Sequence, residues 1–178
     1  MLSTDERMEI WALLRLLLNN YKDKRMRLSE VFKPQFIITD LKAHDKKGVL
    51  EELSKVITEQ EPSLDRGFLL QVLLERERLG STGIGDGIAL PHGKLRELKR
   101  LLISFGRSIN GLEFDSIDEQ PAYLFFLLLA PENSAGKHLK ALAKISRMLK
   151  DGNFRRRLMA AKSRHEIYKI VVGKDEEF

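Results

Sequence analysis

Residues 77–93 read ERLGSTGIGDGIALPHG, and five of the fourteen residues from Gly80 to Gly93 are glycine. Glycine adopts positive φ angles and allows the backbone to approach a ligand closely. Successive exposed N–H groups in such a loop favour an anion. No Gly-Lys-Ser/Thr sequence closes the loop and it does not open a helix, so it is neither a Walker loop nor a dinucleotide fingerprint. Glycines also serve plain turns, so anion binding and a structural turn both stay open.

His92 ends this stretch and is the candidate nucleophile. Pro91 fixes φ immediately before it, and a proline pushes the preceding residue, Leu90, toward an extended conformation. The imidazole therefore sits at the end of a short strand on a stiffened backbone. A histidine titrates at about pH 6.5, so a neutral, nucleophilic nitrogen is available at cytoplasmic pH. We expect a backbone carbonyl, unnamed by the sequence, to orient the other ring nitrogen.

The elements around this stretch predict an α/β fold. Gln35 to Thr39 is typical of a strand, and apolar residues at helical spacing predict helices over 46–59 and 66–78, the second capped by Asp65. Two apolar runs follow, 101–105 and 122–129, and the second is continuous, so both its faces are expected to be buried. Asn110-Gly111 indicates a turn in the loop 109–121 between them.

The end of the chain is predicted to be helical. Leu139, Leu142, Ile145 and Leu149 recur at helical spacing after Ser134, and a short helix is expected over 153–161. Ser163 and Glu166 form a capping box for the last helix. The order of strand, two helices, several strands and then helices predicts a mixed β-sheet sandwiched between helix layers.

Composition narrows the function. A chain of 178 residues fits one domain, and the absence of cysteine excludes disulfides, thiolate metal sites and a cysteine nucleophile. The 31 Lys and Arg are interspersed with 26 Asp and Glu, so no nucleic-acid partner is expected. No run approaches the roughly 20 apolar residues of a membrane span, which favours a cytoplasmic protein. No histidine and carboxylate pair has metal-ligand spacing, so neither a metal nor a cofactor is expected.

Residues 1–26 form a separate N-terminal extension in this interpretation, followed by one domain over 27–178. Apolar residues at helical spacing predict an amphipathic helix and a linker: Ile10, Leu13, Leu14, Leu17 and Leu18. Such a helix needs an apolar surface, its own or a partner's. A partner-binding helix, a homo-oligomer contact and translation from an upstream start codon all remain open.

The motif around His92 resembles the active-site signature of type-2 enzyme IIA domains of the bacterial phosphotransferase system, the mannitol and fructose class. It consists of Glu77, Ile84-Gly85 and Ile88-Ala89-Leu90-Pro91-His92-Gly93. The resemblance covers roughly residues 28–172. It is closest to the nitrogen-regulatory branch, because GSTGIG stands at Gly80–Gly85 and Gly-Lys-Leu follows His92.

The resemblance implies roles for three residues. His92 would be phosphorylated on Nε2, His138 would be the second active-site histidine, and Arg76 would lie beside the pocket. It also implies a fold shared with cytoplasmic domains of anion transporters. Phosphoryl transfer asks for positioning and charge stabilisation, which a planar guanidinium and the start of a helix can supply. A surface histidine and a helix-terminal arginine are the structural alternatives.

The loop residues are weaker candidates for phosphate binding: Ser81, Thr82, Gly83, Gly85, Gly87 and Gly93. The two hydroxyls could equally make turn or capping bonds. Asp86 would repel a phosphate, and His44 and His165 are expected to face solvent.

Three functions follow. The first is a regulatory phosphocarrier, a phosphotransferase with a phosphohistidine intermediate. It would receive phosphate from a histidine phosphocarrier protein and bind a downstream regulatory protein. The second is a sugar-specific enzyme IIA that passes phosphate from His92 to a IIB domain in fructose- or mannitol-type transport. The third is a non-catalytic binding module of the same fold. The complete motif favours the first two.

Overall fold

A computed structural model of the chain describes residues 26–177. The amphipathic helix predicted near the N-terminus lies outside these residues. Within them the element order is strand, two helices, five strands and three helices, preceded by the single helical turn α2 (Leu28–Val31). The predicted order is therefore confirmed.

The first two helices form where the sequence predicts them, and the structure adds a cap at Asp45 to the predicted cap at Asp65. α3 spans Lys46–Thr58, and the Asp45 carboxylate accepts a hydrogen bond from Gly48 N at 2.7 Å. α4 spans Arg66–Arg78, and Asp65 accepts from Phe68 N at 2.6 Å. Each cap satisfies a backbone N–H that has no partner within its helix.

Six strands form one mixed sheet: β1 (Phe32–Ile38), β2 (Gly83–Gly85), β3 (Ile88–Ala89), β4 (His92–Leu95), β5 (Leu102–Leu112) and β6 (Ala122–Pro131). Their order is β1-β5-β6-β3-β2. β4 also pairs with β6, nearer to the C-terminal end of β6 than β3 does. β5 and β6 are antiparallel, whereas β1 runs parallel to β5, and β3 and β4 run parallel to β6. The paired residues His92 and Leu128 place the candidate nucleophile at the start of β4.

One predicted loop boundary is wrong. β5 continues through Ile109 to Leu112, where the sequence indicated a turn. Gly111 does adopt a positive φ of 71°, but it does so at a shift in register between β5 and β6. An Asn-Gly pair suits a β-bulge as well as a hairpin turn, because both use glycine at positive φ.

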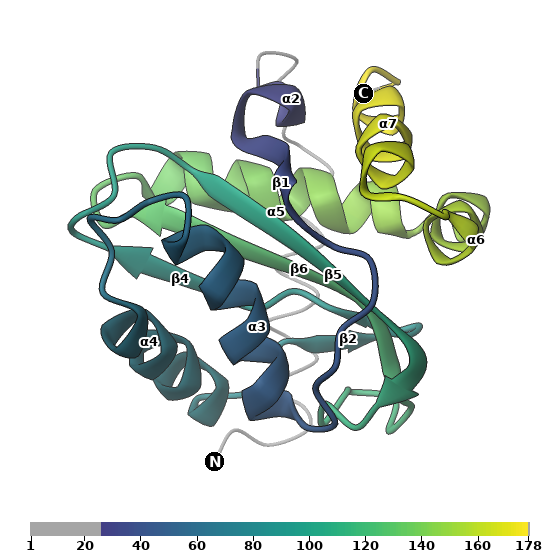
Figure 1. Ribbon diagram of the computed structural model, residues 1–178, viewed down its shortest axis with the longest axis horizontal. Helices are drawn as coiled ribbons and strands as arrows, with labels where there is room; N and C mark the ends of the chain where they lie inside the picture. The colour runs from purple at the N-terminus through teal and green to yellow at the C-terminus, as the bar shows by residue number, and fades with distance from the viewer. Residues whose placement is uncertain (1–25, 178) are drawn as a thin grey trace.

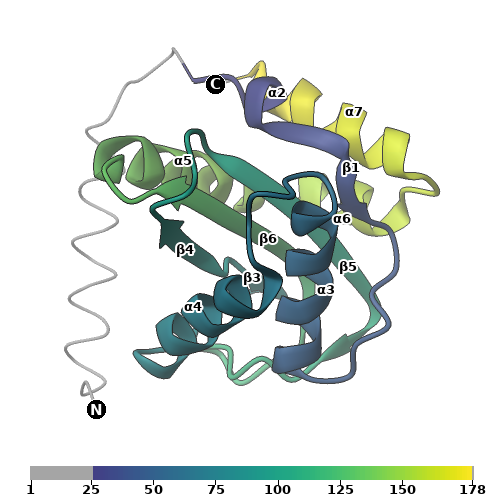
Figure 2. The same ribbon diagram turned by 60° about the vertical axis from the view of Figure 1, so that its left-hand side comes forward.

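Helices cover both faces of the sheet, as Figures 1 and 2 show. α3 and α4 lie on one face, and α5 (Ala135–Leu149), α6 (Gly152–Ala160) and α7 (Arg164–Asp175) lie on the other. Each face of the sheet has its own apolar core. β6 contributes Phe125 and Leu127 to the core under α3 and α4, and Phe126 and Leu128 to the core under α5, α6 and α7. Both of its faces are buried, as its continuous apolar run predicted. None of the helices within residues 26–177 is long and apolar enough to cross a membrane.

The C-terminal helices differ from the prediction in detail. Leu139 is 52% exposed, and the buried stripe of α5 runs instead through His138, Ala141, Ile145, Met148 and Leu149. α6 begins at Gly152 because Asp151 caps it. Ser163 caps α7 as predicted, but the Glu166 carboxylate accepts from Lys162 N rather than from the cap residue.

Candidate functional site

His92 lies where the strand interrupted by Pro91 resumes. Leu90 N donates to Thr82 O at 2.9 Å, and Pro91 O accepts from Leu128 N at 2.9 Å. The Leu90 carbonyl, by contrast with these backbone bonds, is hydrogen-bonded to the His92 side chain, 2.8 Å from Nδ1. This carbonyl is the acceptor that sequence reasoning could not name, because a local backbone turn directs it.

Arg76 fixes the tautomer of His92. Its Nε donates to His92 Nε2 at 3.1 Å, and its terminal nitrogen donates to Gly80 O at 2.9 Å. Because a guanidinium can only donate, His92 Nε2 must be an acceptor with a free lone pair. Nδ1 then carries the proton and donates it to Leu90 O. The imidazole is thus neutral, with its basic nitrogen directed toward Arg76.

His138 approaches from the opposite helix layer. Its ring centroid lies 5.4 Å from that of His92, with 55° between the ring planes. The residue is 6% exposed, and its Nε2 has no hydrogen-bond partner within the described part of the chain. A buried polar atom is almost always paired, so this nitrogen is a candidate hydrogen-bond donor or acceptor for a bound group.

The N-terminus of α5 adds positive potential beside His138. His138 is the fourth residue of α5, and its N–H closes the first helical bond, to Ser134 O at 3.0 Å. The Ser134 hydroxyl makes no capping bond and donates instead to Pro131 O at 2.7 Å. The free N–H groups of a first helical turn favour an anion and disfavour an imidazolium.

Both site histidines are held neutral at physiological pH. Burial lowers the pKa of His92 to about 4, and the charges of Arg76 and Lys94 act in the same direction against the Leu90 carbonyl. Burial also lowers the pKa of His138 to about 4, helped by the charges of His92, Lys94 and Arg76. Desolvation disfavours the charged form of each ring, so His92 keeps its nucleophilic lone pair.

The predicted loop hydroxyls have partners within the protein. The Ser81 hydroxyl donates to Phe114 O at 2.8 Å, and the Thr82 hydroxyl bonds the Glu77 carboxylate. These are the turn bonds that the sequence analysis weighed against phosphate contacts. A phosphate-binding role for either residue stays a prediction.

The glycines serve close packing at different places. Gly85 and Gly87 have φ angles of 87° and 75° in the β2–β3 turn, and the atoms nearest to an added Cβ belong to Asp118 and Tyr123. A Cβ on Gly83 would lie 2.8 Å from Ser116 Cα. A Cβ on Gly93 would meet Val72 at 3.3 Å, so this glycine lets β4 pack against α4 beside His92.

The remaining predicted residues lie apart from the cluster. His44 and His165 are exposed, as expected. Asp86 is exposed and adopts a positive φ of 55° in the β2–β3 turn, where its N–H donates to Asp118. Sequence reasoning missed Lys46, which approaches Glu77 from α3, because only packing of α3 against α4 brings the two together.

Comparisons with known proteins identify the family of the chain. Residues 30–173 match the family described as phosphoenolpyruvate-dependent sugar phosphotransferase system, EIIA 2. The chain is 40% identical over 146 residues to a nitrogen regulatory protein of Bradyrhizobium diazoefficiens, covering 82% of this chain and 95% of that protein. It is 34% identical over 151 residues to the PTS system fructose-specific EIIABC component of Bacillus subtilis, of which it spans 24%.

Solved structures share the fold. The crystal structure of nitrogen regulatory protein IIA-Ntr from Neisseria meningitidis superposes with a TM-score of 0.76 at 35% identity, covering 81% of this chain and 98% of that one. Enzyme IIAMTL, in its complex with phosphorylated enzyme IIBMTL from Escherichia coli, superposes with a TM-score of 0.67 at 23% identity, covering 80% and 99%. The chain belongs to the type-2 EIIA family of the phosphoenolpyruvate-dependent phosphotransferase system.

Proposed function

We propose that this protein is a phosphocarrier that accepts a phosphoryl group on His92 Nε2 from a histidine phosphocarrier protein in the cytoplasm. One observation carries the proposal. The neutral Nε2 of His92 is directed at a guanidinium, and beside it stands a second buried histidine, whose Nε2 has no hydrogen-bond partner among residues 26–177. A phosphoryl group on Nε2 would complete that environment.

The transfer requires little covalent chemistry of the protein. The Nε2 lone pair forms a bond to phosphorus as the donor's N–P bond breaks, and the electron pair of that bond returns to the donor's ring nitrogen. No proton has to leave His92, because Nδ1–H stays bonded to Leu90 O and stabilises the positive charge on the phosphorylated ring. Arg76 exchanges its bond to Nε2 for bonds to the phosphoryl oxygens, and His138 donates a hydrogen bond to one of them.

Regulation of the nitrogen type is the role that we favour. The chain is 40% identical to a nitrogen regulatory protein and 34% identical to the fructose-specific component. A protein of this kind would bind a downstream regulatory protein differently in its two phosphorylation states. The second candidate is a sugar-specific enzyme IIA that passes its phosphate to a IIB domain, which the match to the fructose-specific component supports.

The test is intact mass after incubation with phosphoenolpyruvate, enzyme I and a histidine phosphocarrier protein. We expect an acid-labile gain of one phosphoryl group in the wild type and none in His92→Ala, while His165→Ala, an exposed control, behaves as the wild type. Phosphate retained in His92→Ala would refute the site. No uptake by any form would favour a non-catalytic binding module. Rapid discharge onto a IIB domain would favour the sugar-specific role.

A further inference from the structure

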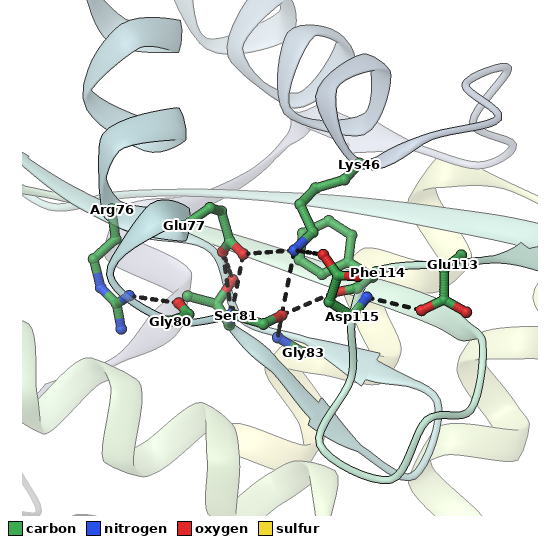
Figure 3. Close-up of polar contacts among 10 residues, drawn as sticks. Lys46, Arg76, Glu77, Gly80, Ser81, Gly83, Glu113, Phe114 and Asp115 are labelled. Carbon is green, nitrogen blue, oxygen red and sulfur yellow. Dashed lines mark hydrogen bonds and ion pairs between the residues drawn. The ribbon is translucent and has the colours of Figure 1, made fainter. Parts of the chain in front are cut away.

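A charged network surrounds Glu77, the residue that follows Arg76 at the end of α4 (Figure 3). Its side chain is only 6% exposed. Both of its carboxylate oxygens accept from Thr82 N at 3.2 Å, and the Thr82 hydroxyl bonds it too. Lys46 Nζ lies 3.2 Å from the carboxylate. A buried carboxylate without a countercharge is strongly destabilising, and Lys46 supplies that countercharge.

Lys46 joins three segments that are distant in sequence. It is the first residue of α3, and its Nζ lies 2.7 Å from the Asp115 carboxylate and 4.8 Å from the centre of the Phe114 ring. Ser81 lies between these groups, since its hydroxyl donates to Phe114 O and accepts from Gly83 N at 3.1 Å. The network thereby connects the start of α3, the turn after α4 and the segment between β5 and β6.

The same turn holds Arg76. The Arg76 guanidinium donates to Gly80 O, and Glu77 binds Thr82 only two residues further on. Figure 3 shows Arg76 and Glu77 on either side of the turn. The Gly80 carbonyl that holds the guanidinium therefore lies in the same short turn that Glu77 binds through Thr82.

We propose that Lys46 and Glu77 are positioning residues for phosphoryl transfer: their ion pair fixes the Gly80–Thr82 turn, which holds Arg76 against His92. The inference rests on the proposed function of His92. Both residues act through Arg76 rather than on the phosphoryl group.

A double-mutant cycle tests this dependence. Phosphoryl uptake from a phosphorylated histidine phosphocarrier protein is followed by rapid quench and intact mass. Lys46→Met keeps the aliphatic stem and removes the charge, and we expect uptake to slow about tenfold because Arg76 is misplaced. In an Arg76→Met background the same substitution should slow uptake less than about twofold, because nothing is left to position.

Three further variants make the cycle interpretable. Lys47→Met is the matched control, because Lys47 is 64% exposed and pairs only with Glu51 at 3.7 Å among the ion pairs of residues 26–177; it should keep the wild-type rate. Lys46→Arg retains the charge and should retain most of the rate. Glu77→Gln breaks the same ion pair with little change in volume. If thermal unfolding shows that Lys46→Met does not fold, Glu77→Gln takes its place in the cycle.

Titration of His92 by NMR in the unphosphorylated protein separates this inference from the proposed function. Burial is the main cause of the lowered pKa of His92, and the charge of Arg76 lowers it further, so a displaced Arg76 should let that pKa rise in Lys46→Met but not in Lys47→Met. Absence of phosphate uptake in the wild type would refute the phosphocarrier role alone. An equal fractional loss of rate in both backgrounds, or an unchanged His92 titration in Lys46→Met, would overturn the positioning role.

Discussion

At the scale of single residues, the site depends on how His92 is held between two hydrogen bonds of opposite kind. The Leu90 carbonyl accepts from Nδ1, and Arg76 donates to Nε2. Each bond enforces the other, since a neutral imidazole has one donor and one acceptor. Pro91 lies between β3 and β4, where the Leu90 carbonyl bonds the side chain of His92.

His138→Ala should slow phosphoryl uptake by about 10- to 100-fold without abolishing it. The variant removes a donor aimed at charge that develops on the phosphoryl group, and a single such donor contributes on this order. Rapid-quench uptake kinetics measure the effect, with His165→Ala as the exposed control. An unchanged uptake rate in His138→Ala would show that His138 only fills space beside His92.

At the scale of elements, a buried arginine ties α6 to the sheet. Arg107 of β5 is 6% exposed, and its guanidinium donates to the carbonyls of Leu158, Met159 and Ala161 at 2.7–2.9 Å. These carbonyls belong to the end of α6, where the last turn lacks helical partners. A fourth bond, to Thr39 O, joins the same side chain to the segment after β1.

Arg107→Met should lower the free energy of unfolding by about 2–4 kcal/mol, because it leaves buried carbonyls without donors. Urea denaturation measures the change, and Arg157→Met on the exposed face of α6 should stay within about 0.5 kcal/mol of the wild type. Phosphoryl uptake by the folded fraction should be unchanged. Equal stability of the two variants would show that the α6 carbonyls have other partners.

Local signals predicted some element boundaries well and others poorly. α3 follows a clear apolar period and α4 begins at the Asp65 cap, so their limits could be predicted within a residue or so. The end of β5 could not, because the Asn110-Gly111 pair is compatible with either a bulge or a turn. Pairing with β6 decides between them, and pairing depends on the partner strand rather than on the local sequence.

At the scale of the whole molecule, the two neutral histidines make folding depend on pH. Burial is the main reason that the pKa of each is lowered to about 4, whereas a histidine in the unfolded chain has a pKa of about 6.5. Between these values the unfolded chain binds more protons than the folded protein. Stability from this source is therefore fully present above about pH 6.5 and is lost as the pH falls toward 4.

We expect the free energy of unfolding to fall by about 1–2 kcal/mol per site histidine between pH 7 and pH 5. Urea denaturation at both pH values measures the fall, and His92→Asn combined with His138→Asn should reduce it. Replacement of exposed His44 by Gln should leave the fall as it is. The hydrogen bond from Lys174 is the main reason that the pKa of Asp151 is lowered to about 2. Protonation of Asp151 therefore does not contribute to the fall between pH 7 and pH 5. An equal fall in the double variant would place the pH dependence elsewhere.

The sequence by itself determined the order of the elements and the strand buried on both faces, and it supplied His92 as the candidate nucleophile. These depend on apolar period, capping residues and a contiguous motif, all of which are local. Only the tertiary structure decided what surrounds His92. Arg76 comes from the helix layer on one face of the sheet and His138 from the layer on the other, and they meet only where β4 begins between the two layers. The Leu90 carbonyl and the Lys46–Glu77 pair likewise depend on a strand interruption and on helix packing. The contacts of His92 with Arg76 and His138 join residues from two helix layers, and no local pattern of side chains encodes them.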